Sequence, residues 1–269
     1  MADSLDLVAD EKISSQKNQS TKHPRRILVE VVILGALYAI YTYARNANEA
    51  SESLALSNAE LIIRFEKFLH IYVEQPIHEF FLNYEWIIVG ANYFYGSLHF
   101  IVTIFALVYV FIKDPGRYSQ VRTTIVLGTL IALVGFLTFP LMPPRLLDPS
   151  YGFVDTLAKF PTFWSFNSDE FATISNQFAA MPSVHIVWST WCVFALFPYA
   201  KQQWKKILLC IYPCCTFFVI IITSNHYILD AVAGLSVFTI AYFASRMITS
   251  LTTRSAIDKT ASLADTSAK

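Results

Sequence analysis

Residues 225–248 read NHYILDAVAGLSVFTIAYFASRMI, an apolar run that opens on a histidine and a carboxylate. The run from Tyr227 to Ile248 is long enough to cross a bilayer as a helix, so it predicts a membrane-spanning segment. His226 and Asp230 are four residues apart, which places both side chains on one helix face. There the carboxylate can hold one ring nitrogen and leave the other available for chemistry. An ionisable group inside a span indicates function, and a hydrogen bond between helices is the alternative.

The composition is that of a membrane protein. The chain has 269 residues, of which 55% are hydrophobic and 15% aromatic, and its mean hydropathy is +0.46. These values predict a polytopic membrane protein. The formal net charge is zero, and the lack of a basic stripe argues against a nucleic-acid partner. The cysteines lie in apolar segments without disulfide or zinc spacing, which predicts small core side chains at Cys192, Cys210, Cys214 and Cys215.

Six apolar runs predict an all-α fold, a polytopic membrane helix bundle of six transmembrane helices. The runs cover residues 27–43, 86–112, 121–139, 184–199, 207–222 and 227–248. Four segments follow from this pattern: a disordered cytosolic tail over 1–24, the first span with an amphipathic helix over 25–85, the main bundle over 86–248, and a second cytosolic tail over 249–269.

The segment between the first two spans predicts an amphipathic helix over residues 58–84 that lies in the membrane interface. Its apolar residues recur at helical spacing and alternate with charged residues. The charged residues are Glu60, Arg64, Glu66, Lys67 and Glu74. Pro76 is expected to break or kink the helix. The alternative is a helix that only packs over the outer mouth of the bundle.

The basic residues predict the orientation. With six spans, fifteen of the twenty Lys and Arg residues fall on the side of the N-terminus. The positive-inside rule then places both termini in the cytosol. The loop 140–182 faces the outer side, whether periplasmic, extracellular or lumenal. Arg145, His185, His226 and Asp230 should therefore cluster near the outer boundary of the bilayer.

The loop 140–182 supplies candidate side chains at both ends. Two prolines stiffen the chain before Arg145, whose planar guanidinium can bond two phosphate oxygens. A snorkelling interfacial Arg is the alternative. At the other end, Pro182 and Ser183 suit the first turn of a helix, whose free amides attract anions. Ser183 alternatively serves only as a helix cap, and His185 would project from the same turn.

Together these groups describe phosphoryl transfer through a phospho-histidine. One imidazole attacks phosphorus while the other protonates the departing alkoxide. The sequence has no cluster of Asp, Glu and Cys that predicts a metal site, so cationic side chains and amides would hold the phosphate charge. No metal and no cofactor is therefore expected.

The motifs PPRLL (143–147), MPSVH (181–185) and NHYILD (225–230) resemble the type-2 phosphatidic acid phosphatase superfamily. That superfamily includes lipid phosphate phosphatases and inositol phosphorylceramide synthases, and the resemblance covers residues 86–248. It implies His226 as nucleophile, Asp230 as its partner, His185 as the acid for the leaving group, and Ser183 and Arg145 as phosphate contacts.

Four positions depart from the superfamily's pattern. Its phosphatases usually have Lys, Pro, Gly and Arg where this chain has Thr138, Leu146, Val184 and Ile220. Three phosphate-binding cations are thus reduced to one, Arg145. This sparse pattern is more similar to the inositolphosphotransferase branch, because a phosphodiester carries less charge than a monoester at neutral pH.

The resemblance implies an integral membrane enzyme that transfers a lipid head group. Its substrate would be a phospholipid or lipid phosphate, and its acceptor an alcohol. A phosphatase of phosphatidic acid or polyprenyl pyrophosphate type is the alternative. A non-enzymatic membrane protein is the second alternative.

One more histidine lies within the second span. At the usual rise per residue of an α-helix, His99 lies about 20 Å along the helix from Trp86. It is therefore expected to lie too deep to share the outer site, and is interpreted as a packing histidine. Tyr95 is a candidate for lining a path for lipid.

Overall fold

The computed structural model describes residues 27–44, 51–160, 162 and 177–267, with side chains as far as residue 252. The predicted tail over 1–24 lies outside the described residues. The chain divides into two units, Met1–Ala47 and Asn48–Lys269. The first unit holds the helix Ile27–Ala44, which is long and apolar enough to cross a membrane and corresponds to the first predicted span.

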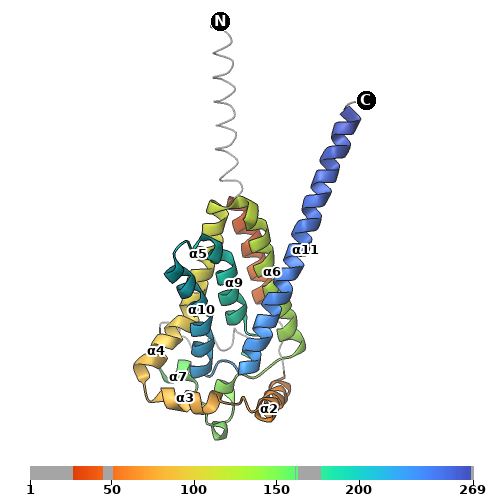
Figure 1. Cartoon of the computed structure of the whole chain (residues 1–269). Coiled ribbons are helices and arrows are strands. Elements are labelled where there is room, and N and C mark those ends of the chain that lie inside the picture. The colour runs from red at the N-terminus through yellow and green to blue at the C-terminus, as the bar shows by residue number, and fades with distance from the viewer. Residues whose placement is uncertain (1–26, 45–50, 161, 163–176, 268–269) are drawn as a thin grey trace. The chain divides into compact units, whose positions relative to one another are not determined.

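The second unit is built from helices, and the all-α prediction is confirmed. The longer elements are α2 (Glu52–Phe68), α3 (Glu74–Leu82), α4 (Glu85–Tyr93), α5 (His99–Lys113), α6 (Pro115–Thr138), α9 (Val184–Leu196), α10 (Gln203–Ile222) and α11 (Ile228–Ser267). A π-helical turn, Phe94–Leu98, joins α4 to α5, and the short helix α7 (Thr156–Lys159) lies in the long loop. Figure 1 shows this order.

Five helices in the described residues are long and apolar enough to span a membrane. They are Ile27–Ala44, Glu85–Lys113, Pro115–Thr138, Gln203–Ile222 and Ile228–Thr252. The apolar helix at the fourth predicted span, Val184–Tyr199, is shorter, so a count of six stays a prediction. The third span begins earlier than predicted because Asp114 caps the helix by accepting from the Arg117 amide, with Pro115 next.

The short helix α9 lies inside the bundle, in contact with α5, α6, α10 and α11 (Figure 1). Its residues Trp191 and Cys192 are fully buried, and the Trp191 indole donates to the Val121 carbonyl at 2.9 Å. Among the cysteines the core prediction holds only for Cys192. It is wrong for Cys210, Cys214 and Cys215, which are exposed on α10, because that part of α10 turns this face away from the bundle.

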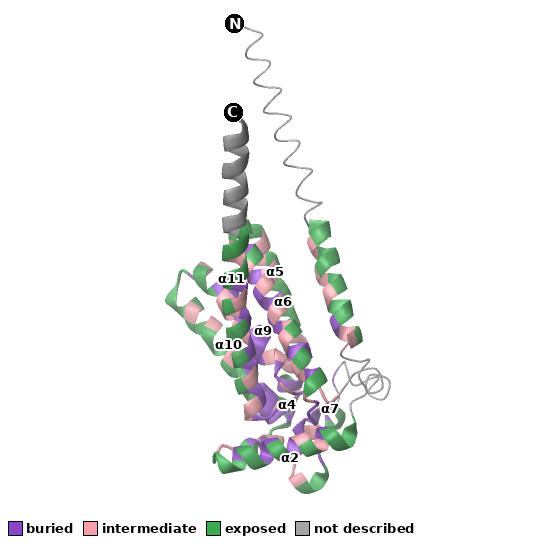
Figure 2. Ribbon diagram, turned by 90° about the vertical axis from the view of Figure 1, so that its right-hand side faces the viewer, coloured by how far each residue is buried: buried purple, intermediate pink, exposed green. Residues whose placement is uncertain are grey.

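Helices α2 and α3 lie across one end of the bundle, at a steep angle to the spans (Figures 1 and 2). The single predicted helix over 58–84 is wrong in its details. The chain leaves the helix at Leu69, and His70 has a φ of 58°, which a continuing helix cannot accommodate. Pro76 lies in the first turn of α3, where its missing N–H breaks no helical bond.

The exposed side of α2 carries three large apolar side chains beside charged ones such as Arg64. Leu61 and Phe65 are each 49% exposed and Phe68 is 75% exposed, whereas Ile62 and Ile63 are buried. The interfacial placement of this helix stays a prediction.

Gly234 on α11 allows the start of α9 to approach closely. A Cβ at position 234 would stand 2.5 Å from the Ser183 carbonyl oxygen and 3.2 Å from Ile186 Cβ. The first of these contacts is with backbone, which cannot rotate away. Glycine therefore sets how closely α9 and α11 pack, as small residues often do between membrane helices.

We expect Gly234→Ala to lower the free energy of unfolding by about 1–3 kcal/mol through overpacking, measured as thermal unfolding in detergent. The matched control is Gly90→Ala on α4, where an added Cβ meets nothing within 4 Å. That control should be neutral or slightly stabilising, since alanine favours helix over glycine. Equal effects of the two variants would contradict the packing argument.

Candidate active site

The turn Thr223–Tyr227 connects α10 to α11 and carries the candidate nucleophile. Ser224 takes a left-handed conformation with a φ of 52°. This conformation lets the Asn225 and His226 amides both donate to the Ile220 carbonyl, at 3.1 and 3.2 Å. The backbone of the turn is thereby fixed to the end of α10.

His226 and Asp230 form the pair that their spacing suggested. The Nδ1 atom of His226 lies 3.1 Å from Oδ2 of Asp230, and the Tyr227 amide donates to the same oxygen at 3.0 Å. Only 4% of His226 and none of Asp230 is exposed. Nε2 of His226 and Oδ1 of Asp230 have no hydrogen-bond partner among the residues that the structure describes. The pair therefore holds an oriented imidazole with one nitrogen uncommitted.

The start of α9 faces this imidazole. The ring centroids of His185 and His226 are 5.7 Å apart, with the planes at 65°. The Ser183 amide donates to the Asp230 carbonyl at 3.0 Å, which ties the start of α9 to the first turn of α11. The Ser183 hydroxyl is buried without a partner and makes no cap hydrogen bond. The capping alternative for Ser183 is thus not what the structure has.

His99 belongs to this cluster, and the prediction that it lies too deep was wrong. The ring centroids of His99 and His185 are 4.4 Å apart. The Tyr95 ring stacks on the His185 ring, with centroids 4.1 Å apart and planes at 21°. Nδ1 of His99 donates to the Tyr95 carbonyl at 2.9 Å. The depth count followed the second span alone and could not show that α5 packs against α9, which brings His99 beside His185.

The backbone of Arg145 contacts the turn Thr223–Tyr227. Its amide donates to the Ser224 carbonyl at 2.8 Å. Its side chain, 16% exposed, donates from Nη1 to Oδ2 of Asp155 at 2.7 Å, and Nε is buried without a partner. The side chain is therefore held in place rather than snorkelling, and its charge is balanced by a carboxylate that the sequence did not reveal.

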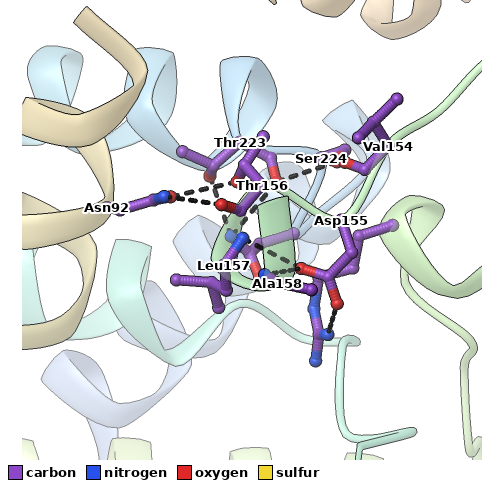
Figure 3. Close-up of polar contacts among 10 residues, drawn as sticks. Asn92, Val154, Asp155, Thr156, Leu157, Ala158, Thr223 and Ser224 are labelled. Carbon is purple, nitrogen blue, oxygen red and sulfur yellow. Dashed lines mark hydrogen bonds and ion pairs between the residues drawn. The ribbon is translucent and has the colours of Figure 1, made fainter. Parts of the chain in front are cut away.

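Figure 3 shows how the loop around Asp155 is fixed. Oδ1 of Asp155 accepts from the Leu157 and Ala158 amides and so caps α7. Thr156 and Asn92 exchange hydrogen bonds at 3.0 Å, which anchors the loop to α4. These hydrogen bonds hold Asp155 in position for its ion pair with Arg145.

A buried histidine joins the same loop to α10. His78 is fully buried, its Nδ1–H donates to the Ile222 carbonyl at 2.8 Å, and its Nε2 accepts from the Val154 amide at 3.1 Å. Burial lowers the pKa of His78 below its usual 6.5. The ring must be neutral here, because a proton on Nε2 would point at the N–H of the Val154 amide and break this hydrogen bond.

The described residues contain no group of three or more His, Cys, Asp or Glu that could hold a metal ion.

Comparison with known proteins identifies the family. A family model of the PAP2 superfamily matches residues 60–244. The chain belongs to the PAP2 superfamily. The matched region contains all five predicted site residues and begins within α2, earlier than the 86–248 expected from the motifs. The search of curated proteins found no match, and neither did the search of solved structures.

Membership of the PAP2 superfamily supports an enzyme of the phosphatase or phosphotransferase type that acts on lipid phosphates. Together with the apolar helices, it supports an integral membrane protein.

Proposed function

We propose that this protein is a metal-independent lipid head-group phosphotransferase, of the inositolphosphotransferase type, that works through a phospho-histidine at His226. One observation carries the proposal. Nδ1 of His226 is bonded to Asp230, and Nε2 is buried without a partner. A carboxylate acceptor keeps the proton on Nδ1, so the lone pair lies on Nε2 and is free to attack.

In the proposed first step, Nε2 of His226 attacks phosphorus and the bond from phosphorus to the leaving oxygen breaks. The bonding electrons go to that oxygen, which takes a proton from His185. Asp230 offsets the positive charge that develops on His226. In the second step an acceptor hydroxyl gives its proton to His185 and attacks phosphorus, and the phosphorus–nitrogen bond electrons return to His226.

Two further donors are placed to hold the phosphate. Within the described residues, the buried Ser183 hydroxyl and Nε of Arg145 have no partner, and an unpaired buried donor is costly unless a ligand uses it. Oxygens of a phosphoryl group are suitable acceptors. These roles follow the resemblance stated for the two residues, and the unpaired atoms support them.

The charge of the site favours a phosphodiester. Arg145 is already paired with Asp155, so the cation adds little net positive charge. A monoester carries about −1.5 to −2 at neutral pH, whereas a diester carries a single charge. A site with one balanced cation therefore suits a phospholipid diester, which is the substrate class of a head-group transferase.

This argument predicts an altered preference in Asp155→Asn. Removal of the carboxylate charge should raise the ratio of kcat/KM for a lipid phosphomonoester over a phosphodiester, by about tenfold for each 1.4 kcal/mol of added attraction. Asp148→Asn is the matched control, because Asp148 caps a turn of the same loop by accepting from the Ser150 amide. An unchanged ratio in Asp155→Asn would contradict the charge argument.

The function itself is tested with purified protein and a panel of phospholipids labelled in the head group, with and without inositol or ceramide as acceptor. We expect label on the acceptor. Release of free phosphate or free head-group phosphate, independent of acceptor, would show a phosphatase instead. Absence of turnover across the panel, with His226→Ala indistinguishable from wild type, would support a non-enzymatic protein.

A further inference from the structure

The first turn of α11 is held by two buried glutamates from α2 and α3. The Ile228 amide donates to Oε1 of Glu74 and the Leu229 amide to Oε1 of Glu66, both at 2.8 Å. Neither glutamate is exposed. The two carboxyls therefore bind consecutive amides at a helix N-terminus, immediately after His226 in the chain.

Each of these carboxyls has one oxygen left over. Oε2 of Glu66 and Oε2 of Glu74 are buried and have no hydrogen-bond partner in the described structure. Two neighbouring buried carboxylates repel each other, and an unpaired charged oxygen is costly. Burial and the neighbouring Glu74 carboxyl raise the pKa of Glu66 to about 9. Glu66 therefore carries a proton at neutral pH. The unpaired oxygen of the neighbouring Glu74 is a suitable acceptor for that proton.

We propose that Glu66 and Glu74 share one proton and together act as positioning residues for the His226–Asp230 pair. The inference deepens the proposed function and rests on it for its link to catalysis. The shared proton supplies one donor and one acceptor, so both leftover oxygens are used. The pair can then keep both Oε1 atoms on the amides of α11.

The link to the reaction centre is short. Ile228 and Leu229 lie between His226 and Asp230 in the sequence, so the amides that the glutamates hold belong to the helical turn that sets the pair's geometry. A shift of this turn would move Nδ1 of His226 away from its 3.1 Å contact with Asp230. Small misplacements of a catalytic group carry large costs in rate.

The other ionisable groups around the glutamates do not titrate in the same range. Burial raises the pKa of Tyr72, which follows α2, to about 12. Burial also raises the pKa of Tyr227, in the catalytic turn, well above 10. Asp230, on α11, stays bonded to His226. Glu66, whose pKa is raised to about 9, is thus the group of this cluster that loses a proton between pH 8 and 10.

The sign of the pH effect follows from the raised pKa. A free carboxyl with the ordinary pKa of 4.5 has lost its proton at pH 7, whereas Glu66 in the folded protein keeps it until about pH 9. The contribution of this proton to stability is complete below the ordinary pKa and is lost as the pH rises through the folded pKa. Above pH 9 two buried carboxylates face each other.

The test compares kcat and thermal unfolding in detergent from pH 6 to 10. Glu66→Gln keeps the acceptor for Leu229 and gives Glu74 an amide donor that does not titrate. We expect a loss of about threefold in kcat at pH 7, while the ratio of Glu66→Gln to wild-type activity rises about tenfold from pH 8 to 10. The exposed Glu79→Gln on α3 is the control and should follow wild type at every pH.

The double variant Glu66→Gln/Glu74→Gln separates proton sharing from simple amide capping. Both glutamines retain an oxygen for the α11 amides, but two NH2 groups then meet without an acceptor. We expect a loss of about a hundredfold in kcat and a lower unfolding temperature than in either single variant. A double variant as active and as stable as Glu66→Gln would overturn the proposal. Thermal unfolding gives this answer even if no lipid is turned over, so failure of the proposed function is recognised separately.

Discussion

His226→Ala is expected to abolish turnover of labelled phospholipid, with a loss of about 10⁴-fold or more, because the attacking nitrogen is removed. Wild-type samples quenched in alkaline denaturant, where the phosphorus–nitrogen bond survives, should contain a covalent phosphoryl-enzyme, and samples of His226→Ala should not. His70→Asn is the matched control, since His70 is exposed and asparagine tolerates its left-handed conformation. Retention of labelled protein in His226→Ala would place the nucleophile elsewhere.

The role of His185 is separated from that of His226 by the choice of leaving group. His185→Asn should slow release of a lipid alkoxide by about 10²–10⁴-fold, the usual contribution of a general acid. It should have far less effect on a nitrophenyl phosphodiester, whose leaving group departs without a proton. Equal losses with both substrates would contradict the assignment of His185 as the acid.

Asp230→Asn is the second substitution with a large expected effect. Oδ2 of Asp230 accepts from both His226 Nδ1 and the Tyr227 amide, and an asparagine oxygen in its place would lack the negative charge that stabilises a positive His226. An NH2 group facing Nδ1 would favour the other tautomer, which puts a proton on Nε2 and removes its lone pair. We expect kcat to fall by about 10²–10⁴-fold.

The measurement for Asp230→Asn is single-turnover transfer of a labelled head group, with thermal unfolding of the same sample. The unfolding temperature should change little, because asparagine has nearly the same volume as aspartate. A loss of activity matched by a comparable loss of folded protein would show that Asp230 acts only through stability. Activity near that of wild type would contradict its role in orienting His226.

The helical class and the motif residues of the site could be predicted from sequence because they depend on local pattern. Apolar runs of sufficient length predict spans whatever their partners, and the spacing of His226 and Asp230 fixes a shared helix face. The predicted motif residues also meet in space: Ser183 bonds to Asp230 through the backbone, and Arg145 bonds to Ser224.

Other residues of the site depend on contacts between distant segments, which a single sequence does not contain. Glu66 and Glu74 alternate with apolar residues and were interpreted as the polar face of an amphipathic helix, but they bond to amides more than 150 residues away. Asp155 lies in a loop without a motif. In each case a partner that only the fold supplies makes up for the water that the carboxyl group loses.

The π-helical turn Phe94–Leu98 has a consequence for insertions and deletions in this span. A π turn contains one residue more than an α turn, and each residue of an α-helix advances the chain by about 100°. Because the π turn takes up one extra residue, an α turn of unchanged length would rotate His99 and the rest of α5 by about 100° relative to α4. The face that meets His185 would then point elsewhere. Relatives of the same length should therefore keep the π turn where they keep this imidazole cluster, and relatives with one residue fewer between Asn92 and His99 should have an α turn instead.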